Sequence, residues 1–507
     1  MPGGSGGPAR TRRPSPLRVS RRRFLQASAG AVAQAATDRP NIILFYVDEL
    51  RATALRLHNP DGVATPNLAR LASRGVTFEY AFTPHPLCMP ARVSLWTGQY
   101  SHTHGSRHNQ KPMADGLPCM AQVLRNAGYT LGIFGKNHCF TPSQLERWFA
   151  VNLSTDSPKW RRSLSTEEAA GSDRLRQWIS RQGGPMMPPM AAPFPPEVQP
   201  THLITQRAIE FLERGQGAPF ALWISIIDPH NPIQAPERFA GVMPPDRLNL
   251  PPWRPDSIRS NNSRMQIYNY LTRGAELTDD YLRRYLSIYY AMVAFIDYEL
   301  GRLLKVLEQR RLLERTIIVF TSDHGDFAAQ HHLLYKTGSL VDAMVRIPLV
   351  LSWPGRLPEN VRERALVNQI DIMPTLLRLC GLDVPEGVQG MPLPLRSGDT
   401  RRSFVYSEYG AGGPDYDWRH AKALGTPERL GDYPVQSEKE LEHLYLRERG
   451  GHLQMIRTHT HKLIQDSNGE AEFYDLAADP DELENVHNRS AYRSEEAELT
   501  RLLGTIV

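Results

Sequence analysis

The segment HPLCMPARVSLW, residues 85–96, holds a cysteine in a setting that could do chemistry. Cys88 lies between Pro86 and Pro90, and Arg92 follows four residues later. Because Pro90 suits the first turn of a helix, we expect Cys88 at a helix N-terminus, where backbone N–H groups and the helix dipole favour anions. One interpretation is a plain thiolate nucleophile. A second and more specific one depends on the whole pattern Cys-x-Pro-x-Arg.

Charged and imidazole side chains also stand at the ends of four apolar segments. The segments are 41–47, 130–136, 220–227 and 316–322, and the residues that end or follow them are Asp48, Lys136, His138, Asp228, His230, Asp323 and His324. A single aspartate after a strand is usually a helix cap. Four segments that each deliver such groups indicate a shared site, because ligands of open α/β sheets bind at the carboxyl ends of the strands.

The four apolar segments must be strands for this site to form. Continuous apolar runs such as NIILFYV are typical of parallel strands buried on both faces. Helical patterns alternate with them, at residues 65–74, with Thr65 as N-cap and Pro66 at the first helical position, and at residues 279–313. We therefore predict an α/β fold with a mostly parallel sheet flanked by helices. The Pro-rich segments 183–200 and 250–262 are predicted loops or insertions.

The chain changes character after about residue 400. HLQMIRTHTHKLIQ and EAEFYDL are typical of antiparallel strands, and SEEAELTRLL of a closing helix. The predicted organisation is a leader over residues 1–36, an α/β catalytic domain over 37–400, and a smaller antiparallel sheet with a helix over 401–507.

The N-terminus accounts for the basic charge of the chain. Lys and Arg number 59 against 54 Asp and Glu, but seven arginines and no acid lie within residues 1–36, which leaves 52 against 54 in the rest. A near-neutral body does not favour nucleic-acid binding. The stretch SRRRFLQASAGAVAQAA resembles a twin-arginine export signal cleaved near Ala36, the alternative being a basic tail. This resemblance implies the twin-arginine translocase as a partner and a periplasmic or secreted protein, and no run suggests a membrane span.

In its context, Cys-x-Pro-x-Arg resembles the type I, formylglycine-dependent sulfatases of the alkaline-phosphatase superfamily. The likeness extends over residues 39–486 through RPNIILFYVDELR, CMPARVSLWTGQYSHTHGSRHN, GYTLGIFGKNHCF, YYAMVAFIDYELGRLL, TSDHGDFAAQHHLLYKTGSLVDAMVRIPLVLSWPG and EFYDLAADPDELEN. Several motifs in the family's order carry far more weight than one short motif. The resemblance implies an alkaline-phosphatase-like fold and hydrolysis of sulfuric esters.

The same resemblance implies a role for each site residue. Cys88 would be converted to Cα-formylglycine by a formylglycine-generating enzyme. One hydroxyl of its hydrate would attack sulfur, and the second would lose its proton so that sulfate leaves and the aldehyde returns. The implied metal ligands are Asp48, residue 88, Asp323 and His324. Arg92 and His138 would hold the hydrate, Lys136 and Lys336 would neutralise sulfate oxygens, His230 would protonate the leaving oxygen, and Asn109 would contact the substrate.

Two positions depart from the commonest pattern of that family. Many members have a second aspartate after the first strand and Asp-Asn at the second metal strand, where this chain has Glu49 and Asp323-His324. Oxygen ligands suit a hard cation, and Ca²⁺ is therefore the first expectation. An imidazole ligand admits Mn²⁺ or Fe²⁺ more readily than an all-oxygen site does, so Mn²⁺ is the alternative. The Asp-His pair also resembles choline sulfatases and phosphonate monoester hydrolases. Glu49 is expected either to bind the metal or only to face the pocket.

Three functions remain open from the sequence. The first is hydrolysis of an aryl, choline or carbohydrate sulfate, and the second is hydrolysis of phosphonate monoesters or phosphodiesters by the same nucleophile. The third is non-catalytic binding of sulfated glycans, which the intact nucleophile precursor and both lysines disfavour. The substrate would depend on residues 153–200, residues 231–262 and the C-terminal unit.

Other reactive side chains receive structural interpretations. A histidine cluster, His102, His104 and His108, could suggest zinc, but a solvated loop is preferred because no nearby cysteine or acidic pair completes a tetrahedral site. Asp297, inside the long helix, is predicted to be structural. The remaining cysteines are predicted to be buried and reduced: Cys119, Cys139 and Cys380.

Overall fold

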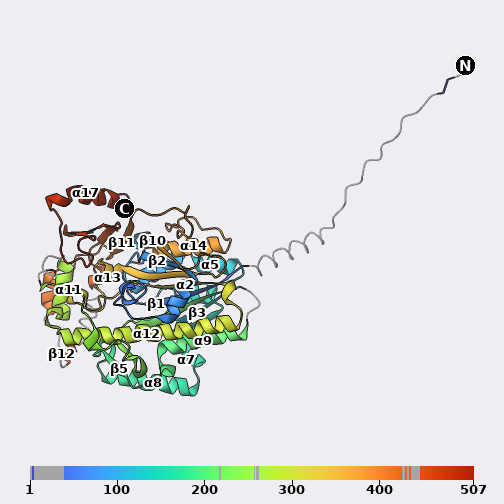
Figure 1. The fold of residues 1–507 in the computed structure, drawn as a ribbon, viewed down its shortest axis with the longest axis horizontal. Helices are drawn as coiled ribbons and strands as arrows, with labels where there is room; N and C mark the ends of the chain where they lie inside the picture. Colours follow the sequence, from blue (N-terminus) through green and yellow to red (C-terminus); the bar gives the residue numbers. More distant parts are fainter. Residues whose placement is uncertain are drawn as a thin grey trace. The chain divides into compact units, whose positions relative to one another are not determined.

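The computed structural model describes residues 3–4, 39–215, 219–255, 257, 262–424, 429–430, 433–434, 443 and 446–506. Apart from residues 3 and 4, the expected export signal over residues 1–36 lies outside these ranges and stays a prediction. Residues 40–507 form one compact unit (Figure 1). Within the described ranges, no helix combines the length and apolarity that crossing a bilayer requires.

The compact unit is built on an eight-stranded sheet with the order β10-β2-β9-β8-β1-β6-β3-β4. Its strands are β1 (Asn41–Asp48), β2 (Gly75–Phe82), β3 (Thr130–Gly135), β4 (Val151–Ser154), β6 (Phe220–Pro229), β8 (Thr316–Ser322), β9 (Arg346–Ser352) and β10 (Val361–Asn368). The four strands predicted from apolar runs are neighbours at its centre, β8-β1-β6-β3, and all their pairings are parallel. β9 runs antiparallel to both β2 and β8, so the sheet is mixed but mostly parallel, as predicted.

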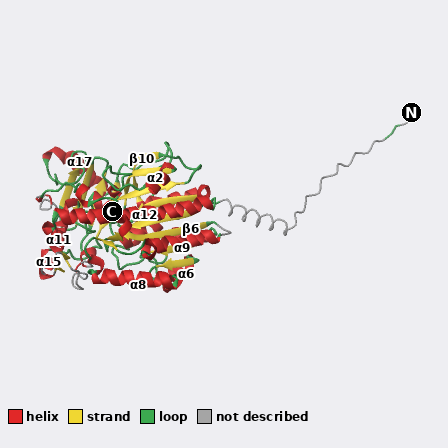
Figure 2. Ribbon diagram, turned by 60° about the horizontal axis from the view of Figure 1, so that its bottom comes forward, coloured by secondary structure: helices red, strands yellow, loops and turns green. Residues whose placement is uncertain are grey.

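Alternation along β1 explains why the sheet needs helices on both faces. Ile43, Phe45 and Val47 belong to one hydrophobic core, and Ile42 and Leu44 to another. Successive strand side chains point to opposite faces, so a strand without polar positions must be covered twice. The first core is closed by α2 (Pro66–Ser73), α9 (Pro200–Arg214) and α12 (Asp279–Gln309), and the second by α3 (Cys88–Thr97), α5 (Met120–Asn126) and α14 (Ile372–Leu379). Figure 2 shows several of these helices beside the strands.

Helix α2 is capped differently from the expectation. It starts at Pro66 as predicted, but the Thr65 side chain makes no capping hydrogen bond. Instead, Asp297 of α12 accepts hydrogen bonds from the backbone N–H of Asn67 at 3.1 Å and of Leu68 at 2.8 Å. A carboxylate from a neighbouring helix thus satisfies N–H groups that have no partner inside α2. The structural role predicted for Asp297 is explained by this cap.

Two further boundaries differ from the sequence prediction. Helix α12 ends at Gln309 rather than at residue 313, and Arg311 adopts a positive φ of 54° that no helix continues through. The segment over residues 183–200, predicted as a loop or an insertion, contains the short strand β5 (Met190–Ala192), which pairs in parallel with β7 (Gln234–Pro236).

Helix α3 is buried on every side. All ten residues from Cys88 to Thr97 are buried, including Arg92. A helix without a solvent-facing stripe belongs to the interior of a protein. Burying a side chain such as Val93 or Leu95 contributes about 1.5–3 kcal/mol, so packing fixes the position of this helix firmly.

The C-terminal segment forms the antiparallel sheet and helix that were predicted. The sheet has the order β11-β14-β15-β16, with β11 (Val405–Tyr409), β14 (Leu453–Arg457), β15 (His461–Asp466) and β16 (Ala471–Asp475), and α17 (Arg493–Leu503) packs against β14 and β15. The boundary at residue 400 stays a prediction. The remaining elements are α4 (Ser101–His104), α6 (Pro142–Trp148), α7 (Pro158–Ser163), α8 (Thr166–Arg181), α11 (Ser263–Thr272), α13 (Asp342–Val345), α15 (Trp418–Leu424), β12 (Arg429–Leu430) and β13 (Tyr433–Pro434).

Candidate active site

The carboxyl ends of the central strands bring polar side chains to one edge of the sheet, as the sequence pattern indicated. Asp48 is the last residue of β1, Asp323 and His324 directly follow β8, and Lys136 directly follows β3. Cys88 reaches the same place from the first residue of α3. Parallel neighbouring strands end together, which is why residues far apart in the chain meet here.

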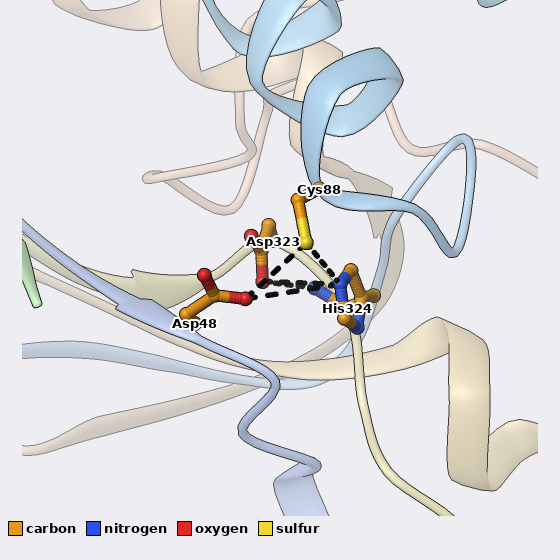
Figure 3. A group of neighbouring side chains, drawn as sticks. All are labelled: Asp48, Cys88, Asp323 and His324. Atoms are coloured by element: carbon orange, nitrogen blue, oxygen red, sulfur yellow. Dashed lines mark hydrogen bonds and ion pairs between the residues drawn. The ribbon is translucent and has the colours of Figure 1, made fainter. Parts of the chain in front are cut away.

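Four buried side chains form a group that could hold a metal ion: Asp48, Cys88, Asp323 and His324. Their ligand atoms all lie within 4.8 Å of one another (Figure 3). The Cys88 Sγ atom is 3.5 Å from Oδ1 of Asp48 and 3.3 Å from Nε2 of His324. Two carboxylates and an imidazole in one buried cluster are a donor set for a divalent cation.

His324 is oriented by its own backbone surroundings. Its Nδ1 lies 2.9 Å from the carbonyl oxygen of Gly325, so Nδ1–H donates and Nε2 faces the cluster. A second-shell carbonyl of this kind fixes the tautomer that metal ligation requires. Burial alone would lower the pKa of His324, but the anionic charge of Asp323 and Cys88 raises it to about 9. The cluster therefore attracts positive charge, and a divalent cation fits it.

Arg92 joins the two metal-type carboxylates. Its Nη2 lies 3.3 Å from Asp48 Oδ2 and 3.0 Å from Asp323 Oδ2, and its Nη1 donates to Ser225 Oγ at 2.7 Å. Nη1 also donates to the carbonyl oxygen of Lys136 at 3.1 Å. These contacts hold the carboxylates in place. A direct contact between Arg92 and residue 88, which the resemblance implied, stays a prediction.

Two lysines add positive charge at the mouth of the cluster. Lys136 forms an ion pair with Asp48, and Lys336 Nζ lies 2.6 Å from Glu49 Oε2. Burial alone would raise the pKa of the Cys88 thiol, but these two ammonium groups hold that pKa well below its usual value. The site is thus arranged to stabilise an anion at residue 88.

His138 and His230 have different partners in this region. A side-chain hydrogen bond from His138 contributes to the lowered pKa of Cys88, while the Nδ1 atom of His138 is buried without a hydrogen-bond partner among the described residues. His230 Nδ1 lies 2.9 Å from the carbonyl oxygen of Asn231, which leaves Nε2, 3.4 Å from Glu49 Oε2, directed to the site. His138 is therefore beside the nucleophile position, and His230 is held near Lys336 by a shared carboxylate.

Glu49 is more closely involved than the sequence suggested. It adopts a positive φ of 65°, and its backbone N–H donates to Asp323 Oδ1 at 3.0 Å. Its carboxylate contacts both Lys336 and His230, and it forms a second metal-capable group with Asp48 and His230. A strained backbone held by the surrounding structure is common at functional sites. Glu49 therefore links Lys336 and His230 through one carboxylate.

Asp228 lies within β6 and is not a member of the metal-capable groups among the described residues. It accepts a hydrogen bond from Thr201 Oγ1 at 2.6 Å, and burial raises its pKa to about 6. Asn109 accepts from the backbone N–H of Met89 at 3.1 Å and donates to Glu448 at 2.9 Å. Sequence reasoning missed Glu448, because nothing near it in the chain resembles a catalytic motif.

The histidines at the end of α4 do not form a solvated loop. His104 is buried, its Nε2 contacts Ser94 Oγ at 2.9 Å, and burial lowers its pKa to about 3. His102 binds the buried carboxylate of Glu408 through its backbone N–H at 2.7 Å and Nδ1 at 2.9 Å. The expectation of a solvated loop was wrong for His102 and His104, because Glu408 of β11 supplies an internal acceptor to this turn, whereas His108 lies in the loop after α4 and is only partly buried. The other cysteines are buried and free, as predicted: Cys119, Cys139 and Cys380.

Comparisons with known proteins identify the family of this chain. The sequence pattern of the sulfatase family matches residues 40–382. The chain is 25% identical to the arylsulfatase of Clostridium perfringens over 92% of its own length and 94% of the relative's. It is 26% identical to the N-acetylglucosamine-6-O-sulfatase of Bacteroides thetaiotaomicron, over 97% and 90% of the two chains. The fold resembles that of a phosphonate monoester hydrolase of Silicibacter pomeroyi, with a TM-score of 0.74, 22% identity, and coverage of 92% and 95%.

The fold is of the alkaline-phosphatase-like α/β class, a mostly parallel sheet flanked by helices. Within that class, the chain belongs to the sulfatase family, and it is a sulfuric ester hydrolase.

Proposed function

We propose that this sulfatase acts through a Cα-formylglycine formed from Cys88, together with one divalent metal ion. The convergence of Cys88 with Asp48, Asp323 and His324 carries the proposal. A thiol placed among metal-type ligands and two lysines is well situated to be replaced by a hydroxyl nucleophile. The conversion requires a formylglycine-generating enzyme as a partner.

The metal ligands would be Asp48, residue 88, Asp323 and His324, with Ca²⁺ as the first expectation and Mn²⁺ as the alternative. When bound, the cation would act as a Lewis acid that neutralises negative charge on the sulfate group. Arg92 keeps both carboxylates oriented toward the ion by its contacts with each of them. His324 presents Nε2 because Gly325 occupies Nδ1.

The remaining residues neutralise charge, hold residue 88 and donate a proton. Lys136 and Lys336 are placed to neutralise sulfate oxygens, since preorganised cations stabilise charge without reorganisation. His138 holds the hydroxyl groups of residue 88. His230 Nε2 protonates the oxygen of the leaving alcohol, which matters most when that alcohol is a poor leaving group.

The substrate is a sulfate ester of an aryl alcohol, of choline or of a carbohydrate. Relatives with the names arylsulfatase and N-acetylglucosamine-6-O-sulfatase support aryl and amino-sugar sulfates. The similar fold of a phosphonate monoester hydrolase keeps phosphonate monoesters as the second candidate. Residues 153–200 and 231–262 would determine which of these esters the enzyme accepts. Export by the twin-arginine route to the periplasm or beyond belongs to the same proposal.

The test is turnover by protein produced together with a formylglycine-generating enzyme. A panel of aryl, choline and carbohydrate sulfates is compared with matched phosphonate monoesters. We expect higher kcat/KM on sulfates, and loss of turnover when a chelator removes the metal. Faster turnover of every phosphonate than of any sulfate would favour the second candidate.

A further inference from the structure

The nucleophile helix α3 begins without a cap of its own. Leu87 occupies the N-cap position and has no side-chain acceptor. The Met89 N–H is instead accepted by Oδ1 of Asn109 at 3.1 Å. Since the first N–H groups of a helix have no intrahelical partner, Asn109 replaces the missing cap from the following loop.

Asn109 is itself held by a residue from the far end of the chain. Its Nδ2 donates to Glu448 Oε1 at 2.9 Å, and its backbone N–H donates to Glu448 Oε2 at 3.1 Å. Glu448 lies 339 residues further along, just before β14. Both carboxylate oxygens of Glu448 are therefore engaged by one residue of the active-site loop.

The two bonds fix which way the Asn109 amide faces. The Met89 N–H requires an acceptor, and the Glu448 carboxylate requires a donor, so only one of the two amide orientations satisfies both. An Nδ2 group carries two hydrogens, and Glu448 uses one of them. Under the proposed function, the other hydrogen would bond to an acceptor on the substrate.

Charge explains why a neutral amide stands between the helix and the carboxylate. A glutamate bonded directly to the start of α3 would stabilise the helix dipole but repel the sulfate group. Glu448 is held one residue further back, and burial raises its pKa. Through Asn109, the loop gains rigid support without an anion directly against the nucleophile.

We propose that Glu448 is a positioning residue of the sulfatase site: it orients the Asn109 amide, and thereby the start of α3 and the substrate-facing N–H. The inference rests on the proposed function, because it assigns a task within that site. It makes the C-terminal segment a part of the active site rather than an appended unit.

The test is a double-mutant cycle on nitrophenyl sulfate with Glu448→Ala, Asn109→Ala and the double variant. We expect Glu448→Ala to lower kcat/KM by roughly 10- to 100-fold, as removal of supporting partners does in other sites. In the Asn109→Ala background, where only the backbone N–H of residue 109 still bonds to Glu448, Glu448→Ala should cause a much smaller further loss, because the amide that Glu448 orients is gone. Glu448→Gln, which keeps one accepting oxygen, should retain intermediate activity and serves if the alanine variant does not fold.

The matched control is Glu470→Ala. Glu470 accepts two hydrogen bonds from Ser263, at 2.8 and 2.9 Å, and so has the same number of bonds without a link to the loop. Its kcat/KM should stay near that of the wild type. Additive losses in the cycle, or full activity of Glu448→Ala, would overturn the inference while the function stands. A wild-type protein that turns over no sulfate ester would instead refute the function, and the inference with it.

Discussion

The Sγ atom of Cys88 lies 3.3 Å from Nε2 of His324, a residue 236 positions further along the chain. The two atoms meet because α3 begins, and β8 ends, at the same edge of the sheet. The other ring nitrogen of His324, Nδ1, faces the carbonyl oxygen of Gly325, so Nε2 is the atom that faces residue 88. The relationship makes residue 88 the centre of the predictions that follow.

Residue 88 should carry an aldehyde in active protein. The protein is produced with and without a formylglycine-generating enzyme, and the peptide that contains residue 88 is analysed by mass spectrometry. We expect conversion only in the first preparation, and activity in proportion to it. Cys119, which is buried and whose pKa burial raises to about 12, is the internal control and should remain a cysteine. Full activity with an intact Cys88 thiol would contradict the proposed nucleophile.

The variant Cys88→Ser should stop after one reaction cycle. Its single hydroxyl can attack sulfur, but no second hydroxyl exists to expel sulfate from the carbon. We expect a stable sulfate ester on residue 88, observed by intact mass, and no sustained product release. Cys119→Ser should turn over normally. Multiple turnovers by Cys88→Ser would show that the hydrate mechanism does not apply.

Asp323→Ala should lose both the metal ion and turnover. The carboxylate contacts Arg92 at 3.0 and 3.1 Å and lies in the metal-type group, so its removal also leaves a buried guanidinium short of a partner. Such a loss destabilises a protein by roughly 3–5 kcal/mol. Metal content and the thermal unfolding midpoint are measured together, with Asp323→Asn as the isosteric variant and Asp173→Ala as a surface control. Stoichiometric metal in both Asp323 variants would contradict the ligand assignment.

His230→Ala should be selective for the leaving group. Its kcat/KM on alkyl or sugar sulfates should fall by roughly 10²–10⁴-fold, the usual contribution of a general acid. On nitrophenyl sulfate the loss should be much smaller, because that alcohol leaves without a proton. His420→Ala, at an exposed histidine paired with Asp417, is the control. Equal losses on both kinds of ester would show that His230 does not donate the proton.

The C-terminal sheet should lose stability as the pH rises. Burial raises the pKa of Glu472 to about 7, against 4.5 for an ordinary glutamate. Folding therefore favours the protonated form of Glu472. The stability that this form contributes to the folded state is fully present below about pH 4.5 and is lost as the pH rises through 7. The free energy of unfolding of Glu472→Gln, relative to that of the wild type, should increase by roughly 2 kcal/mol when the pH is raised from 5 to 8. Unfolding midpoints at both pH values measure this, and a difference that does not change with pH would contradict it.

The centre of the fold could be predicted because its strands carry runs of apolar residues. Residues 42–45 are apolar at every successive position, so a strand between two cores accommodates them. The direction of β9 could not be predicted, because an apolar run carries no sign of which way it pairs. The long helix was recognised by its period, but its end at Gln309 depends on a local backbone turn.

The site could be predicted as far as its residues end the strands. Asp48, Asp323 and Lys136 stand at fixed places after apolar runs, and topology alone brings them together. The contacts of Glu49 depend on a positive φ that its neighbours impose. Glu448 comes from a segment whose sequence has no relation to the loop it supports. Such long-range partners are set by tertiary packing, which no local pattern encodes.

The complete burial of α3 has a consequence for the order of events in making this protein. Cys88 is 2% exposed, and Pro90 and Arg92 of the same motif are buried with it. An enzyme that oxidises this cysteine must bind the motif, and in the folded chain the motif is not accessible. The proposed conversion therefore has to occur on a chain that has not yet folded, and folding then buries the converted residue. A molecule that folds before the conversion stays inactive. The yield of active enzyme therefore depends on the rate of modification relative to the rate of folding.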